Sequence, residues 1–220
     1  MKDIQKTEAI KKVRELVLDD PAKRERFEKF QTLAKPIIQE LTELGYNIQT
    51  LGDLRHTGKP WKSALPALLR WLPKVDDPGV KEEIVRCLSV PWLGDAGTAL
   101  LIEEFKKCAP VNELLAWTIG NALSIVDVKR FEAPIIKLCQ NAIYGMTRQM
   151  LVAGLGRFHA AEAENTALQL LRDDSVKLHA VIALGKMKSR QALPALEKLL
   201  TDKNAGIRKE ARKAIESIGP

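Results

Sequence analysis

Apolar residues in the C-terminal part of the chain recur three and four positions apart, which is the pattern of amphipathic helices. One stripe runs through Ala192, Leu193, Leu196, Leu199 and Leu200, and a second through Ile207, Ala211, Ala214, Ile215 and Ile218. Between the stripes, residues 201–206 carry Asp, Asn and Gly, which end helices and form turns. No long window alternates apolar and polar residues, so the pattern predicts paired helices and no sheet.

The helix pair repeats along the chain. The pentapeptide ALPAL occurs at Ala64–Leu68 and again at Ala192–Leu196. An aliphatic anchor beside small residues recurs at intervals of 29 to 35 residues, at Leu88, Leu123, Leu155, Leu184 and Ile215. One helix pair cannot bury its apolar stripes alone, whereas a stack of pairs can. Residues 61–220 are therefore predicted to form five stacked units of about 32 residues.

The N-terminal sixty residues do not follow this period. Ile10, Val13 and Val17 predict one short amphipathic helix. Asp20 and Pro21 predict the start of a second helix, which ends near Gly45. Residues 47–60 are expected to be a long irregular connection. The predicted organisation is thus a helical cap with its connecting loop over 1–60 and one continuous repeat unit over 61–220.

The repeating pattern is an Asp, then Val followed by Lys or Arg, then an Ala, and finally Ala-Leu-Gly, with a period of about 31 residues. This pattern resembles HEAT repeats, and most closely the short subtype named after phycobilisome bilin lyases. The residues that carry the resemblance are Leu168–Met187 and Ala192–Gly219. It implies an all-α fold, a right-handed α-solenoid of about five HEAT-like helix pairs with an N-terminal helical cap. Such repeats serve as scaffolds for many partners, so the fold transfers better than the function.

The resemblance also implies a binding surface. In stacked helical repeats the second helices line the concave side, and the outward positions of these helices differ between repeats. The predicted partner-binding stripe consists of Arg86, Trp117, Asn121, Gln149, Lys209 and Lys213. Aromatic residues dominate binding hot spots, so Trp117 beside Asn121 could anchor a partner. The alternative is that Trp117 simply packs between repeats.

The connecting loop is a second candidate. Residues 50–61 gather Arg55, His56, Lys59 and Trp61 between predicted helices. Long loops inside compact domains are often functional, but a linker that clamps the cap to the first repeat explains the same residues.

The charge is +7, from 35 Lys and Arg against 28 Asp and Glu, and residues 131–220 carry most of the excess. A basic patch could bind phosphate or an acidic partner, although a solvated helix face has the same composition. A basic residue opens four of the second helices, and three aspartates stand just upstream: Lys81, Arg148, Lys177 and Arg208, with Asp77, Asp174 and Asp202. By resemblance to HEAT repeats, this set is interpreted as a structural ladder between repeats rather than a phosphate site.

Catalytic chemistry has little support in the sequence. His56, His159 and His179 are isolated, and Cys87, Cys108 and Cys139 form neither a disulfide framework nor a metal-binding pair. No cofactor or metal is expected. Without a secretory leader or a long apolar run, the chain is expected to be cytoplasmic and independent of membranes.

These observations predict a non-enzymatic scaffold that binds a protein or peptide on the concave face. The alternative is a nucleic-acid-binding protein with the architecture of HEAT-like DNA glycosylases, motivated by the net charge and the basic last helix. The subtype name also suggests a bilin lyase or a chaperone. Nothing in the sequence identifies a chromophore pocket, so this role has little support.

Overall fold

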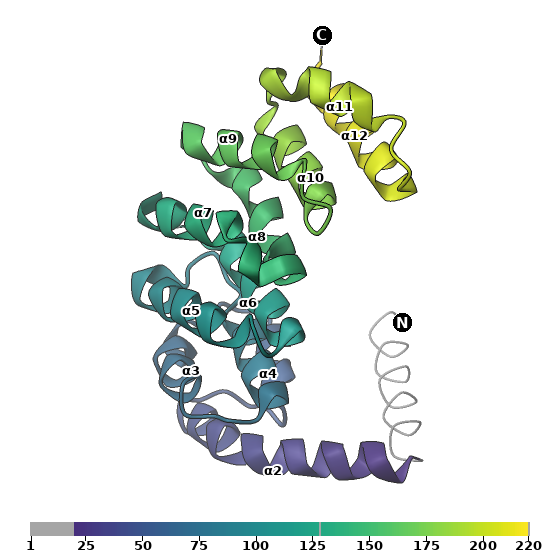
Figure 1. The fold of residues 1–220 in the computed structure, drawn as a ribbon. Helices are drawn as coiled ribbons and strands as arrows, with labels where there is room; N and C mark the ends of the chain where they lie inside the picture. The colour runs from purple at the N-terminus through teal and green to yellow at the C-terminus, as the bar shows by residue number, and fades with distance from the viewer. Residues whose placement is uncertain (1–19, 128, 220) are drawn as a thin grey trace, which may run out of the picture. The chain divides into compact units, whose positions relative to one another are not determined.

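A computed structural model describes residues 20–127 and 129–219. Within these ranges every regular element is a helix, and Figure 1 shows their order. The predicted helix near Ile10, Val13 and Val17 lies outside the described residues. The chain divides into two compact units with the boundary between Glu83 and Ile84, inside α4. The prediction of an all-α solenoid fold is confirmed.

Five helix pairs follow one another along the chain, as the anchor spacing predicts. They are α3 (Leu65–Trp71) with α4 (Pro78–Leu88), α5 (Gly94–Cys108) with α6 (Glu113–Ile125), α7 (Glu132–Gln140) with α8 (Gln149–Gly154), α9 (Ala161–Leu170) with α10 (Lys177–Met187), and α11 (Leu193–Leu199) with α12 (Ala205–Ile218). Four of the predicted anchors, Leu88, Leu123, Leu155 and Leu184, are completely buried, and Ile215 is half-buried.

The N-terminal unit contains the long helix α2 (Pro21–Glu43) and α3. Asp20 caps α2 as predicted, because its carboxylate accepts hydrogen bonds from the backbone N–H groups of Ala22 and Lys23. Glu40 of α2 pairs with Arg70 and accepts a hydrogen bond of 2.7 Å from Nε1 of Trp71 in α3. These bonds fix α2 against α3.

The connection after α2 is more regular than its sequence predicts. The expectation of an irregular segment over 47–60 is wrong, because residues Leu51–His56 form a 3-10 helix, η1. Thr50 and Asp53 cap η1 reciprocally, each side chain accepting a hydrogen bond from the other residue's backbone N–H. Leu51 and Leu54 are completely buried, so η1 belongs to the core of the N-terminal unit.

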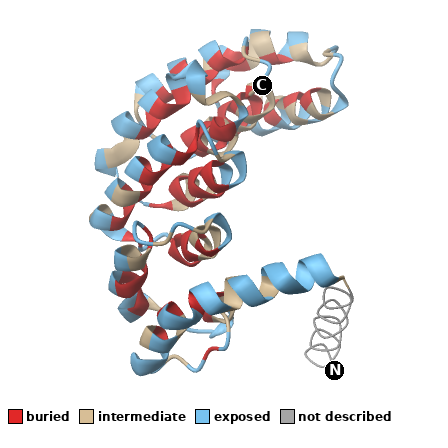
Figure 2. Cartoon of the chain, turned by 60° about the horizontal axis from the view of Figure 1, so that its bottom comes forward, coloured by how far each residue is buried: buried red, intermediate tan, exposed pale blue. Residues whose placement is uncertain are grey.

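In the unit from Ile84 onward the helices form two layers. The second helices pack successively, α6 on α8, α8 on α10 and α10 on α12, while α7 packs on α9 in the other layer. Figure 1 shows the two layers side by side, and Figure 2 shows that the buried residues lie on the facing sides of the helices.

Small residues allow the second helices to approach closely. A Cβ atom added at Gly154 would lie 2.9 Å from Cβ of Ser124, and one added at Gly185 would lie 2.9 Å from Cβ of Ala214. In each contact, a residue next to one anchor meets a residue next to the anchor of the neighbouring pair. The glycine of Ala183-Leu184-Gly185 therefore marks a close backbone approach between neighbouring repeats.

Candidate functional site

The residues predicted to form the concave stripe lie on four second helices of the unit from Ile84 onward. Arg86 lies on α4, Trp117 and Asn121 on α6, Gln149 on α8, and Lys209 and Lys213 on α12. Trp117, Lys209 and Lys213 are exposed, and the other three are half-buried. Because α10 packs between α8 and α12, the two lysines lie apart from Trp117.

Trp117 belongs to a larger group of exposed apolar side chains. Its exposed fraction is 39%, and Leu114, one turn earlier on α6, is 60% exposed. Val111, just before α6, is 83% exposed. Ile143 and Met146 are exposed on η4 (Ala142–Arg148), a 3-10 helix that packs against α6. We call Val111, Leu114, Trp117, Ile143 and Met146 the α6–η4 patch.

Four members of the α6–η4 patch were not identified from the sequence. The three-residue spacing of Val111, Leu114 and Trp117 would have placed them on one face of a helix. Nothing comparable marks Ile143 and Met146, because Gly145 between them has φ 47° and interrupts the helical backbone. Their apolar character alone predicts burial, and only the structure shows that they are exposed.

Two of the predicted stripe residues already make bonds within the protein. Nε2 of Gln149 donates a hydrogen bond of 3.0 Å to the carbonyl oxygen of Ser175, which joins α8 to the next pair. Nζ of Lys213 lies 2.7 Å from Oε1 of Glu210. The Lys213 side chain also lines a groove of about 230 Å³ between α10 and α12. The pairing of Lys213 weakens the case for a purely basic surface on α12.

The loop candidate separates into a structural part and an exposed part. Nη2 of Arg55 lies 2.9 Å from Oε2 of Glu83, and both side chains are about one-third exposed or less. This ion pair joins η1 to α4 within the N-terminal unit. Trp61 is half-buried, whereas His56 and Lys59 are exposed.

The basic residues that open the second helices form bonds between and within repeats. Arg148 is 1% exposed, donates a hydrogen bond of 2.6 Å to the carbonyl oxygen of Cys139, and forms an ion pair with Asp173. Lys177 forms an ion pair with Asp174 in its own repeat. Nζ of Lys177 also lies 3.7 Å from Oδ2 of Asp202, which is in the turn between α11 and α12. For Arg148 and Lys177 these bonds agree with the structural interpretation, and they add Asp173 to the aspartates of the ladder.

The charge states of this ladder follow from its bonds. Partial burial opposes ionisation of Asp173, but hydrogen bonds from Ser175 and the Arg148 guanidinium outweigh it and hold the pKa of Asp173 below its usual value. The hydrogen bond to Asp174 raises the pKa of Lys177. Both shifts favour the charged forms that make the ion pairs.

All three cysteines lie inside the protein. Cys87 and Cys139 are completely buried and Cys108 is 8% exposed. Burial raises the pKa of the Cys139 thiol far above its usual value, although the nearby Arg148 opposes the shift.

We expect the three thiols to resist a thiolate-specific reagent in the native protein. Ellman's reagent at pH 8 should release less than about one equivalent of chromophore before denaturation and three afterwards. Rapid labelling of the native protein would show that one cysteine is accessible and contradict the structural role.

No group of three His, Cys, Asp or Glu side chains in residues 20–127 and 129–219 is placed to hold a metal ion. His179 is half-buried, and burial lowers its pKa. In the same part of the chain, none of the helices has both the length and the apolar character required to cross a membrane.

Comparison with known proteins gives one family and several solved structures, two of which are described here. No curated protein matches the chain. A designed armadillo repeat protein in complex with a (KR)4 peptide is 20% identical, with 93% of this chain and 97% of that chain covered and a TM-score of 0.48. A second designed armadillo repeat protein is 18% identical, with 93% and 98% covered and a TM-score of 0.45. The model of the HEAT repeats family matches residues 133–219, so this part of the chain is similar to HEAT repeats.

Proposed function

We propose that the protein is a non-enzymatic interaction module that binds a partner protein through the α6–η4 patch. The observation that carries this proposal is the exposure of five large apolar side chains, four on α6 and η4, which pack together, and one, Val111, just before α6. An apolar group of this kind marks protein contact sites more often than it marks ordinary surface. Burying it against a partner would remove apolar area from water, which favours association.

The composition of the α6–η4 patch fits the centre of an interface. Trp117 supplies a large, rigid side chain of the type that forms hot spots. Met146 is flexible and adapts its shape to a partner. Asn121, one turn after Trp117, is half-buried and offers an amide for hydrogen bonds at the edge.

The remaining residues of the predicted stripe are assigned to the flanks of this surface. Arg86, Gln149, Lys209 and Lys213 extend it on either side as polar and charged positions of the proposed concave face. Charged residues at a rim affect the rate and specificity of association more than its strength. The short subtype of the HEAT-like repeats and the division into a cap over 1–60 and a repeat unit over 61–220 remain predictions.

Two substitutions test the proposal by capture of partners from a native lysate. Trp117→Ala removes the aromatic anchor, and Leu114→Asp places a charge in the α6–η4 patch. Leu114 is the second residue of α6, where a carboxylate is favourable to the helix, so the fold should tolerate this change. Loss of a hot-spot side chain costs about 2 kcal/mol, so each variant should recover at least about tenfold less of the specific partner.

Leu33→Ala is the matched control, because Leu33 lies on α2 and is 40% exposed, close to the value for Trp117. It should leave recovery unchanged, and circular dichroism should confirm that all three variants are folded. If Trp117→Ala and Leu114→Asp both retain every captured protein, the α6–η4 patch is not the binding site.

A further inference from the structure

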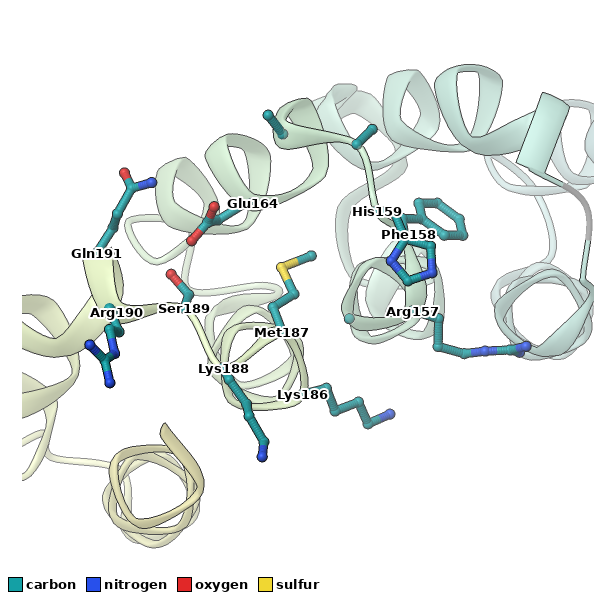
Figure 3. A pocket seen from close by; sticks show the side chains of 13 residues that line it. Arg157, Phe158, His159, Glu164, Lys186, Met187, Lys188, Ser189, Arg190 and Gln191 are labelled. Atoms are coloured by element: carbon teal, nitrogen blue, oxygen red, sulfur yellow. The ribbon is translucent and has the colours of Figure 1, made fainter. Parts of the chain in front are cut away.

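A cavity of about 620 Å³ lies between two consecutive connections of the unit from Ile84 onward. One wall is the segment between α8 and α9, and the other is the segment between α10 and α11. Figure 3 shows the side chains that line it. The charged and ring-nitrogen side chains are Arg157, His159, Glu164, Lys186, Lys188 and Arg190. None of these residues belongs to the α6–η4 patch.

The lining of this cavity is strongly basic. Four of its side chains are cationic and one, Glu164, is a carboxylate. In Figure 3, Lys186 and Lys188 lie at the end of α10, Arg190 lies on the 3-10 turn that follows, and Glu164 lies on α9. Among the described residues, no hydrogen bond or ion pair involves the ammonium groups of Lys186 and Lys188. These two charges are therefore available to an external anion.

The backbone at Lys188 has an uncommon conformation for a residue other than glycine. Lys188 ends α10 with φ 53° and ψ 44°, the left-handed conformation in which many helices end, usually at a glycine. A residue with a Cβ atom is strained in this conformation. Strain of this kind is concentrated at functional positions. Hydrogen bonds from the N–H groups of Lys188 and Ser189 to the carbonyl oxygens of Gly185 and Leu184 hold the turn in place.

The same cavity also offers apolar surface and an unused hydroxyl. Phe158 and Met187 line it, and both are half-buried. Ser189 is 3% exposed, and within the described chain its hydroxyl oxygen makes no hydrogen bond. A buried hydroxyl normally has a partner, so that of Ser189 is an unsatisfied donor in the lining of the cavity.

We propose that this cavity docks an acidic segment of a partner protein. Carboxylates of the segment face Lys186 and Lys188, and an apolar side chain lies against Phe158 and Met187. The combination favours a peptide over a nucleic acid, because a row of phosphates would leave the apolar side chains of Phe158 and Met187 unused. The site is separate from the α6–η4 patch, so either one can be lost without the other.

The test is fluorescence anisotropy with the full chain and a labelled peptide of glutamates around a central leucine, at low salt. The double variant Lys186→Gln, Lys188→Asn removes both charges, and asparagine tolerates the left-handed backbone. We expect its affinity for the peptide to fall by at least about fivefold, as for two charged contacts at an interface. The thermal midpoint should not change.

Three controls define the outcome. Lys198→Gln removes an exposed lysine of α11 outside the cavity and should leave the affinity unchanged, as should Trp117→Ala. The same peptide with glutamine in place of glutamate should not bind. The proposal is overturned if the double variant binds the acidic peptide as well as the wild type does, or if the wild type does not bind it. It is also overturned if labelled oligothymidylate binds more tightly through the same two lysines.

Discussion

Replacing Asp173 by alanine should lower the free energy of unfolding by about 2–3 kcal/mol. The substitution leaves the guanidinium of Arg148, which is 1% exposed, without its anionic partner. Removing one member of a buried ion pair costs about 3–5 kcal/mol, and the loss at Asp173 should lie at or just below the low end of this range because its side chain is 31% exposed. Urea unfolding followed by circular dichroism measures the loss.

Asp174→Ala is the matched control for this prediction. Asp174 is the neighbouring aspartate, but its side chain is 76% exposed and it pairs with Lys177 at the surface. Its removal should leave the urea midpoint close to that of the wild type. Equal losses from the two substitutions would contradict the assignment of Asp173 as the partner of the buried arginine.

The lowered pKa of Asp173 gives the same prediction a pH dependence. A carboxyl group with a lower pKa in the folded state stabilises the protein fully above its unfolded pKa, and this contribution is lost as the pH falls through the folded pKa. The wild type should therefore lose more stability than Asp173→Asn as the pH falls below about 4.

Replacing Gly185 by valine should destabilise the protein by about 2 kcal/mol. A Cβ atom at Gly185 would lie 2.9 Å from Cβ and 3.0 Å from Cα of Ala214. The second of these atoms is backbone, so α10 and α12 would have to move apart to accommodate the side chain. The same urea experiment detects the loss.

Gly120→Ala should stabilise the protein, whereas Gly185→Val destabilises it. Gly120 also lies inside a second helix, α6, but its nearest neighbour is 3.5 Å from the added Cβ atom, an ordinary contact distance. Alanine is the better helix former, so this variant should gain up to about 1 kcal/mol. A loss of stability at Gly120, or none at Gly185, would show that close helix approach is not what these glycines provide.

The repeat architecture could be predicted from the sequence because its cause is periodic. The same small and aliphatic residues recur wherever one second helix packs on the next, so Leu155 and Leu184 could be aligned and placed in the core. The sequence could not show which of Asp173 and Asp174 pairs with Arg148. The two side chains are chemically identical, and only the direction in which each one points from the turn distinguishes them. The 3-10 helix η1 was missed because six residues show too little periodicity to indicate it.

The candidate site was less predictable than the fold. Alignment of the repeats placed Trp117 on an outward position, since every second helix has the same buried face. It gave no indication of Ile143 and Met146, because η4 has no counterpart in the other repeats. The cavity at Lys186 and Lys188 depends on the left-handed turn after α10, and a lysine there gives no signal in the sequence.

Site-specific photocrosslinking is the most direct way to establish whether a partner protein binds on the α6–η4 patch. Leu114 is replaced by benzoylphenylalanine, and in a parallel sample Glu103, an exposed residue of α5 in the other layer, is replaced in the same way. We expect the sample labelled at position 114 to crosslink to the protein whose recovery Leu114→Asp reduces, and the sample labelled at position 103 not to crosslink to it. Equal crosslinking from both positions, or none from position 114 while capture persists, would contradict binding on the α6–η4 patch.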